Sequence, residues 1–173
     1  LHGLVWRSDP ARVIGLYDRW SRYEADDAAV VIYASMYGNT AQMADHIARR
    51  IAEAGVRDIR VYDVSKTHVS YLISEIWRCR GVLLGSCAYN TQMFPLMENL
   101  TRDLLHAGPK DRLLGVFGTY SWNGGGVKNL NAFAEQIGWE TVAPSAEILG
   151  RPTCEKYAAC DALADAMACR LKK

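Results

Sequence analysis

The 173-residue sequence lacks the features that mark several broad classes of protein. Its 20 basic and 19 acidic residues leave a net charge of +1, so it has no strong basic field to attract nucleic acid or an anionic membrane. No apolar run is long enough to span a bilayer, and no segment has the pattern of a signal peptide. We therefore expect neither nucleic acid nor a membrane among its partners.

Disulfide and metal patterns are missing as well. The five cysteines are odd in number and include no Cys-x-x-Cys pair, which argues against a disulfide framework and favours reduced thiols in the cytoplasm. The four histidines do not have the spacing of metal ligands, so the sequence predicts no self-contained metal site. What is present is a globular composition, in which 50% of the residues are hydrophobic, enough to build a core.

Residues 1–27 differ from the rest of the chain and predict a linker helix. Ser8 or Asp9 can cap its start, and Pro10 occupies a position where a helix tolerates a missing N–H. Apolar residues then recur at helical spacing as far as Trp20, before a short polar connection. We expect two parts, a linker over 1–27 and a main domain over 28–173.

The main domain alternates between short apolar runs and helical patterns. Residues 28–34 (AAVVIYA) are typical of a strand buried on both faces. Further strands are predicted at 59–62, 81–86, 113–118 and 141–149, and helices at 40–54, 69–76, 93–104, 127–137 and 157–171. This alternation predicts an α/β fold in which helices cover both faces of an open parallel sheet, since five units are too few for an eight-stranded barrel.

An open parallel sheet binds ligands beyond the carboxyl ends of its strands, and the loop 35–40 (SMYGNT) follows the first strand there. Its backbone N–H groups and the positive end of the next helix meet at one point, which predicts a phosphate site with hydroxyl donors in Ser35 and Thr40. No lysine follows Gly38, which excludes a nucleoside-triphosphate P-loop, and the Gly-x-Gly-x-x-Gly fingerprint is absent. The alternative is an ordinary turn in which Thr40 caps the helix.

Two further loops at the same edge combine aromatic with small polar side chains. Residues 86–91 (SCAYNT) contain Tyr89, and residues 118–126 (GTYSWNGGG) contain Tyr120 and Trp122. Exposed aromatic side chains reduce solubility unless they stack on something, and the alternative is that they fold back onto the rim of the core. A ligand with one phosphate and one flat polycyclic ring would use all three loops, and flavin mononucleotide (FMN) is such a ligand.

These motifs resemble the flavodoxin-like domain of flavodiiron proteins, also called A-type flavoproteins. The resemblance covers essentially the whole chain and is carried by residues 2–7 (HGLVWR), 35–40 (SMYGNT), Tyr89-Asn90, 93–95 (MFP), Tyr120, Trp122 and Gly124-Gly125. It implies a flavodoxin-like three-layer sandwich, with five parallel strands in the order 2-1-3-4-5 and FMN at their carboxyl edge. One departure is Cys87-Ala88, where the family more often has Pro-Thr.

The resemblance also implies which residues bind FMN. Around the phosphate it places Ser35, Tyr37, Gly38, Asn39 and Thr40, with Met36 near the ring. The residues expected around the isoalloxazine ring are Ser86, Cys87, Ala88, Tyr89, Asn90, Thr119, Tyr120, Ser121, Trp122, Asn123 and Gly124. The chain itself is expected to hold no catalytic residue, because the redox chemistry belongs to the flavin.

In this family, an N-terminal metallo-β-lactamase-like domain carries a diiron centre that reduces oxygen or nitric oxide. The resemblance implies that the chain passes electrons to that centre from a redox donor such as rubredoxin or a related carrier. The full-length protein would then be an oxidoreductase that pairs head to tail as a homodimer, and the chain alone only an electron shuttle. His2 matches an iron ligand of the family, but the rest of the ligand set, which begins with an H-x-E-x-D-H run, is not in this chain.

Three other functions use a similar architecture. A flavodoxin-like NAD(P)H:quinone oxidoreductase would bind the same cofactor and would need a substrate pocket over the ring. A cofactor-free interaction module is disfavoured by the intact phosphate loop and by the pair Tyr120 and Trp122. A phosphoacceptor receiver domain needs acidic residues at the strand ends, where Ser35, Ser86 and Thr119 stand instead.

Overall fold

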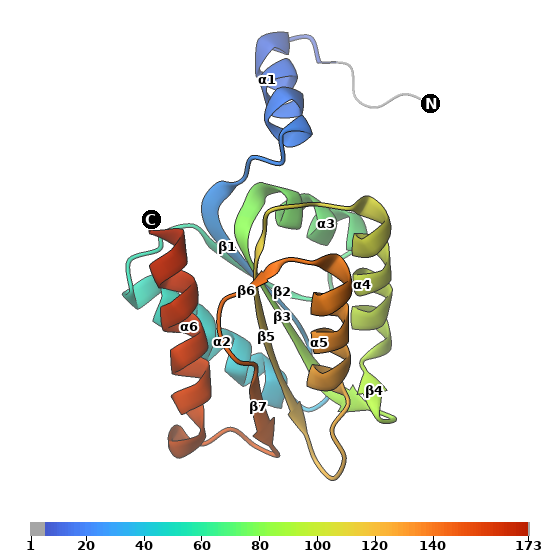
Figure 1. Ribbon diagram of the computed structural model, residues 1–173, viewed down its shortest axis with the longest axis vertical. Coiled ribbons are helices and arrows are strands. Elements are labelled where there is room, and N and C mark those ends of the chain that lie inside the picture. The colour runs from blue at the N-terminus through green and yellow to red at the C-terminus, as the bar shows by residue number, and fades with distance from the viewer. Residues whose placement is uncertain (1–5, 173) are drawn as a thin grey trace.

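The computed structural model describes residues 6–172, which form a sandwich of two helix layers around one sheet (Figure 1). The strands are β1 (Asp26–Ala34), β2 (Ile59–Asp63), β3 (Cys79–Tyr89), β4 (Gln92–Met93), β5 (Leu113–Tyr120), β6 (Glu140–Thr141) and β7 (Ala146–Leu149). The helices are α1 (Pro10–Ser21), α2 (Asn39–Glu53), α3 (Val69–Arg78), α4 (Pro95–Ala107), α5 (Gly126–Ile137) and α6 (Ala158–Leu171), with a 3-10 turn at Cys154–Tyr157.

The central sheet is parallel, and its strand order is β2-β1-β3-β5-β6. This order confirms the predicted flavodoxin-type arrangement 2-1-3-4-5. β7 also pairs with β5, and β4 forms a short antiparallel hairpin with β3. Ala34 is the register partner of Ser86, and Ser86 that of Gly118, so the chain leaves β1, β3 and β5 at one edge.

The sheet is buried on both faces because its strands alternate apolar side chains between two cores. In β1, Val30 and Ile32 pack into one core with α3, α4 and α5, while Ala29 and Val31 pack into the other with α2 and α6. Figure 1 shows these two helix layers on either side of the strands. All four side chains are fully buried, which explains why β1 is continuously apolar after Asp26 and Asp27.

Several predicted elements differ from the structure. The single strand predicted at 141–149 is split into β6 and β7, and Pro144, which has no N–H to donate to a sheet, lies between them. Met93 is predicted to begin α4, but it pairs with β3. The proline that follows Phe94 keeps Phe94 in an extended conformation, so α4 begins only after Phe94. Tyr157 ends the 3-10 turn and does not belong to α6.

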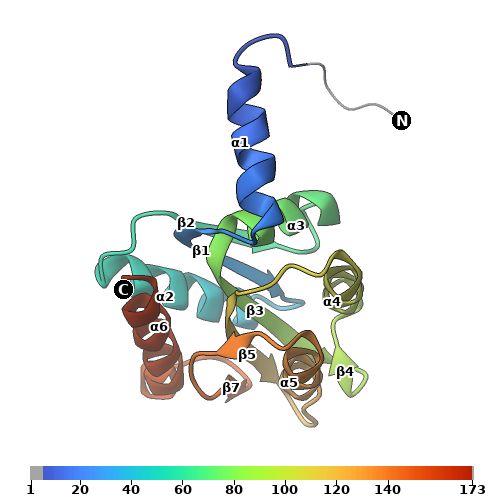
Figure 2. The ribbon, with the colours of Figure 1, turned by 45° about the horizontal axis from the view of Figure 1, so that its top comes forward.

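The helix predicted within residues 1–27 is present as α1. Asp9 caps it by accepting a hydrogen bond from the Arg12 amide at 3.2 Å, and Pro10 lies in its first turn. No residue of α1 is buried, and Ile14 and Tyr17 are 69% and 67% exposed. Figure 2 shows this helix standing away from the sandwich. Between residues 6 and 172, no helix combines the length and the apolarity needed to cross a membrane.

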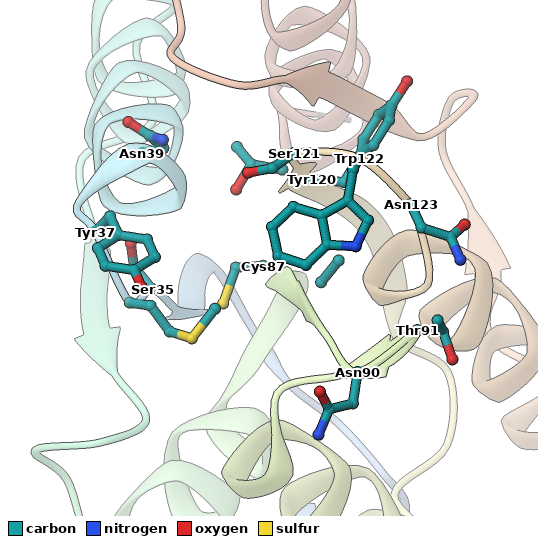
Figure 3. Close-up of a pocket in the computed structure, with 13 residues that line it drawn as sticks. Ser35, Tyr37, Asn39, Cys87, Asn90, Thr91, Tyr120, Ser121, Trp122 and Asn123 are labelled. Carbon is teal, nitrogen blue, oxygen red and sulfur yellow. The ribbon is translucent and has the colours of Figure 1, made fainter.

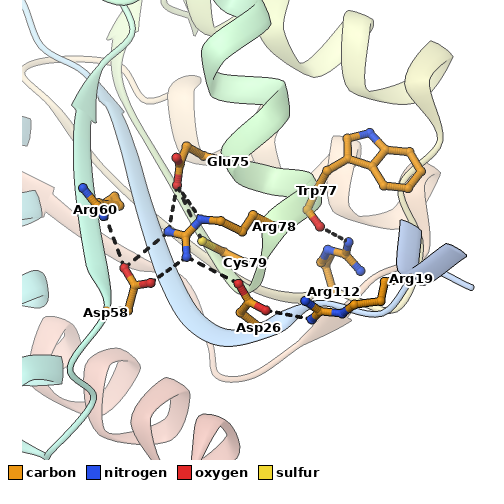
Figure 4. A network of polar contacts seen from close by, with 9 residues as sticks. All are labelled: Arg19, Asp26, Asp58, Arg60, Glu75, Trp77, Arg78, Cys79 and Arg112. Carbon is orange, nitrogen blue, oxygen red and sulfur yellow. Dashed lines mark hydrogen bonds and ion pairs between the residues drawn. The ribbon is translucent and has the colours of Figure 1, made fainter. Parts of the chain in front are cut away.

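An ion-pair network joins the end of α1 to the sandwich (Figure 4). Arg19 of α1 bonds Asp26 at the start of β1, with 2.7 Å between Nη2 and Oδ1. Arg78 of α3 lies 3.7 Å from the same carboxylate and pairs more closely with Asp58 at 2.6 Å and Glu75 at 2.9 Å. The hydrogen bond from Arg78 lowers the pKa of Asp58 below its ordinary value. These side chains are partly exposed and screened by water, so each pair contributes little to stability.

Arg112 is a charged side chain that is almost completely buried, with 1% of its surface exposed. Its guanidinium donates to backbone carbonyls, from Nε to Ile76, from Nη2 to Trp77, and from Nη1 to Tyr23 and Lys110. These carbonyls belong to the end of α3, to the turn after α1 and to the loop before β5. Arg112 therefore holds the turn after α1 against the end of α3, and we call this group of bonds the carbonyl clamp.

Arg112→Met should lower the free energy of unfolding by about 2–4 kcal/mol, because it leaves buried carbonyls without their donors. Arg112→Lys keeps the charge but lacks the planar fork of donors, so it should lose a part of that amount. Urea unfolding followed by circular dichroism measures both variants. Arg57→Met, at an exposed position, is the control and should change the free energy by less than about 0.5 kcal/mol. An equally small change for Arg112→Met would contradict the role of the clamp.

Candidate functional site

A cavity of about 290 Å³ opens at the carboxyl edge of the sheet, where the segments after β1, β3 and β5 meet (Figure 3). Its lining residues are Ser35, Met36, Tyr37, Asn39, Cys87, Ala88, Asn90, Thr91, Thr119, Tyr120, Ser121, Trp122 and Asn123. Each of them except Thr91 is a residue that the sequence predicts for the site. Figure 3 shows Ser35 and Tyr37 on one side of the cavity, Trp122 on the other, and Cys87 between them.

The loop between β1 and α2 forms the wall at which a phosphate is expected. Gly38 has a φ of +82° and precedes α2, whose start has no side-chain cap. The alternative prediction that Thr40 caps this helix is therefore wrong. The first N–H groups of an uncapped helix have no partner within the helix and form the positive end of its dipole, so this wall attracts an anion.

Hydroxyl groups add hydrogen-bond donors to the same wall. The Oγ of Ser35 is shielded from solvent and has no hydrogen-bond partner within the described part of the chain. Leaving a buried hydroxyl unpaired costs about 1–3 kcal/mol, so such a group calls for a ligand or a water. Thr40 and Thr119 share a buried hydrogen bond of 2.8 Å between their Oγ1 atoms. Because only one of the two donates, the other keeps its proton for a further acceptor.

Some predicted residues do not line the cavity. Ser86 is fully buried, where its Oγ donates to the Cys87 carbonyl and accepts from the Phe94 amide, both at 2.9 Å. The ring of Tyr89 packs edge-on against Phe94, with 6.0 Å between the ring centroids. Gly124 lies in the loop after β5. A Cβ added to Gly124 would lie 3.4 Å from Oε1 of Glu147 in β7. Ser86 and Tyr89 therefore support the β3–β4 hairpin.

Thr91 is the lining residue that sequence reasoning missed, and it forms the hairpin turn with Asn90. β3 continues three residues beyond its predicted end, as far as Tyr89, and then turns back into β4. A two-residue turn of this kind needs positive φ at both positions, and the values are +46° at Asn90 and +63° at Thr91. A β-branched residue rarely adopts this conformation, so Thr91 carried no turn signal in the sequence.

Two glycines let the loop after β5 approach this hairpin closely. A Cβ on Gly125 would lie 2.2 Å from the carbonyl oxygen of Thr91, and one on Gly126 would lie 2.9 Å from that of Ser86. Side chains cannot fit at either place without a shift of the backbone. The glycine run thus fixes the separation of two cavity walls.

The aromatic rim of the cavity is exposed. Trp122 is 92% and Tyr37 is 86% exposed, so the alternative that the aromatic residues fold back onto the core is wrong for these two.

Burial raises the pKa of the Cys87 thiol, which is therefore uncharged at neutral pH. The cavity combines hydrogen-bond donors on one wall with apolar ring faces on the other. His2, the predicted iron ligand, lies outside the described residues.

Comparison with known proteins gives the family. Residues 31–162 match the family described as Flavodoxin. The chain belongs to the flavodoxin family. Over 142 residues this flavodoxin-family chain is 33% identical to the anaerobic nitric oxide reductase flavorubredoxin of Pectobacterium carotovorum, a match that covers 81% of the chain and 28% of the relative.

Two solved structures are similar to this flavodoxin-family chain. The rubredoxin oxygen:oxidoreductase of the anaerobe Desulfovibrio gigas has a TM-score of 0.89 at 23% identity, over 94% of this chain and 40% of its own. The flavodiiron protein of Giardia intestinalis has a TM-score of 0.90 at 19% identity, over 98% and 42% of the two chains. The chain corresponds to the flavodoxin-like part of such proteins and spans 28% of the length of the curated relative.

Ser35→Ala should raise the free energy of unfolding of the ligand-free chain by about 1 kcal/mol, because it removes a buried hydroxyl that has no partner. Urea unfolding measures the change. Ser74→Ala, at an exposed position of α3, is the matched control for the loss of a serine hydroxyl. A loss of stability of about 1 kcal/mol or more in Ser35→Ala would mean that the hydroxyl already has a partner in the ligand-free chain.

Proposed function

We propose that this cavity binds FMN and that the chain is an electron-transfer domain. One observation supports the proposal most: the buried, unpartnered hydroxyl of Ser35 lies in the loop that leads to the uncapped start of α2. A phosphate would accept hydrogen bonds both from the Ser35 hydroxyl and from the first N–H groups of α2. The opposite wall carries the exposed ring of Trp122, an apolar surface suited to a flat heterocycle. Membership of the flavodoxin family agrees with this ligand.

The residues present fit FMN. Its phosphate would accept hydrogen bonds from Ser35 Oγ, from the first N–H groups of α2 and from the hydroxyl that is left free in the Thr40–Thr119 pair. No lysine or arginine lies in this loop, so the helix dipole and the N–H groups would balance the charge of the phosphate. Tyr120 and Trp122 would cover the ring and exclude water from it. When bound, the flavin supplies the redox chemistry, while the chain holds and orients it.

We further propose that the chain passes electrons to a diiron centre in a neighbouring domain that reduces oxygen or nitric oxide. Similar proteins are named a nitric oxide reductase flavorubredoxin, a rubredoxin oxygen:oxidoreductase and a flavodiiron protein, and each is longer than this chain. Rubredoxin or a related carrier is the electron donor that these names support. In this proposal His2 contributes to the diiron centre, and the whole protein is the oxidoreductase.

The position of α1 supports a head-to-tail homodimer of the whole protein. α1 leads into the start of β1, whereas the cavity opens beyond the end of that strand (Figure 1). β1 has 9 residues, so its two ends lie about 30 Å apart. A domain joined through α1 would therefore lie far from the cavity of its own chain, and the cavity would meet the corresponding domain of a second subunit.

The ligand-free chain should take up one equivalent of FMN and turn yellow, and Ser35→Ala should bind FMN about 10-fold more weakly, the effect of losing one hydrogen bond to a charged group. Quenching of flavin fluorescence during a titration measures both affinities, and Ser74→Ala should bind like the wild type. A wild-type chain that stays colourless in excess FMN would refute the proposal. Equal affinities of the wild type and Ser35→Ala would remove Ser35 from the phosphate site.

The quinone oxidoreductase alternative is tested on the same preparation. The FMN-loaded chain should not sustain steady-state reduction of a quinone by NADPH, because the cavity loops offer no lysine or arginine for the 2′-phosphate. Absorbance at the NADPH band measures the turnover. Sustained turnover would favour the quinone oxidoreductase over an electron shuttle.

A further inference from the structure

Glu147 places a carboxylate against the loop after β5, although it does not line the cavity itself. Ala146 and Ile148 are buried in the core with α2 and α6, so the side chain of Glu147 between them points to the other face of the sheet. The register partner of Glu147 is Gly118, where an added Cβ would lie 2.8 Å from the Val127 side chain in α5. β7 therefore directs this carboxylate to the side on which the loop joins β5 to α5.

The contact between Glu147 and the loop is made at Gly124. A Cβ on this glycine would lie 3.4 Å from the Glu147 Oε1, so a side chain there would touch the carboxylate. Trp122, which lines the cavity, lies two residues before Gly124. The base of the loop is tied to the end of β7, because the Gly150 amide donates to the Tyr120 carbonyl at 2.7 Å. The carboxylate is thus held next to the wall that offers a ring face to the flavin.

Among residues 6–172, no positive group compensates the Glu147 carboxylate. The loop 121–125 and the segment 142–146 contain no titratable side chain. The titratable groups on the other elements around Glu147 are Tyr120 on β5, Lys128 and Glu135 on α5, and Arg151, Glu155 and Lys156 after β7. Burial alone raises the pKa of Glu147, and none of these groups contributes to the shift. The residue is also exposed on one side, so its carboxyl group can exchange a proton with water.

Reduction of a bound flavin changes the charge next to this carboxylate. When two electrons and one proton enter the ring, the ring is left with one negative charge. An uncompensated carboxylate beside the same wall repels that charge. A neighbouring negative charge favours the protonated form of a carboxyl group, so reduction favours the binding of a second proton at Glu147.

We propose that Glu147 couples the reduction of FMN in this cavity to the uptake of a proton from solvent. Two electrons from the redox donor and one proton enter the ring, the Glu147 carboxylate takes a second proton, and the total charge of the site stays constant. This proposal rests on the proposed FMN function and adds a residue outside the cavity lining to it. Glu147 acts across the loop after β5, so it is a positioning residue and not a catalytic one.

The test is a redox titration of the FMN-loaded chain, followed by flavin absorbance, for the wild type and for Glu147→Gln, which keeps the shape of the side chain. At about pH 8, Glu147→Gln should favour reduced over oxidised FMN about fivefold more than the wild type does, which raises the two-electron midpoint potential by about 20 mV. At about pH 5 the difference should fall below about twofold, because the wild-type carboxyl group then binds its proton. Equal potentials at both pH values, or a difference that does not change with pH, would overturn the proposal.

Glu155→Gln is the matched control for the loss of one carboxylate. Glu155 is exposed in the 3-10 turn after β7, and none of the cavity-lining residues belongs to that turn. Its variant should keep the wild-type potential at both pH values. A shift as large as that of Glu147→Gln would mean that only the net charge of the chain matters, and it would overturn the proposal.

The protonation of Glu147 can also be measured directly. In the NMR spectrum of a chain with ¹³C-labelled glutamate, Glu147→Gln identifies the carboxyl signal, and the pKa of Glu147 should be higher with reduced than with oxidised FMN bound. The same pKa in both states would overturn the proposal. A chain that takes up no FMN would instead refute the proposed function, before any potential is measured.

Discussion

The parallel pairing of β1, β3 and β5 is the constraint on which the rest of this structure depends. Ala34, Ser86 and Gly118 follow one another in register, so three segments that are distant in sequence leave the sheet side by side. None of these segments contains a charged group, and each becomes a cavity wall only through its neighbours. A slip of one residue would turn Val30 and Val31 towards the wrong cores, so burial on both faces fixes the register and with it the cavity.

The strand order and most of the cavity lining could be predicted because they depend on patterns of side chains along the chain. The turn at Asn90 and Thr91 could not, since its backbone conformation is supported by a contact with Gly125 that is remote in sequence. Arg112 could not either, because a single arginine before an apolar strand is typical of an exposed position. Its acceptors are carbonyls, which every residue has, so they leave no trace in the sequence.

The cavity consists of groups whose interactions the chain leaves incomplete. Ser35 has a buried hydroxyl without a partner, α2 begins without a side-chain cap, and Thr91 holds a conformation that is unfavourable for a β-branched residue. Each of these reduces stability, and together they are typical of a site whose structure is completed by a ligand. The two cores on either side of the sheet supply the stability that permits this, since the β1 side chains Ala29 to Ile32 are fully buried.

The carbonyl clamp around Arg112 has a consequence for how such a domain can be recombined with others. The clamp is made by backbone oxygens, so the side chains at 23, 76, 77 and 110 can change without loss of an acceptor, provided that the backbone keeps its path. Side chains on the solvent-facing surface of α1 other than Arg19 can therefore be changed while the turn after the helix keeps its bonds to Arg112. In engineering terms, this junction is held by the backbone acceptors of Arg112 and by the Arg19–Asp26 pair, and the rest of the outer surface of α1 is open to new attachments.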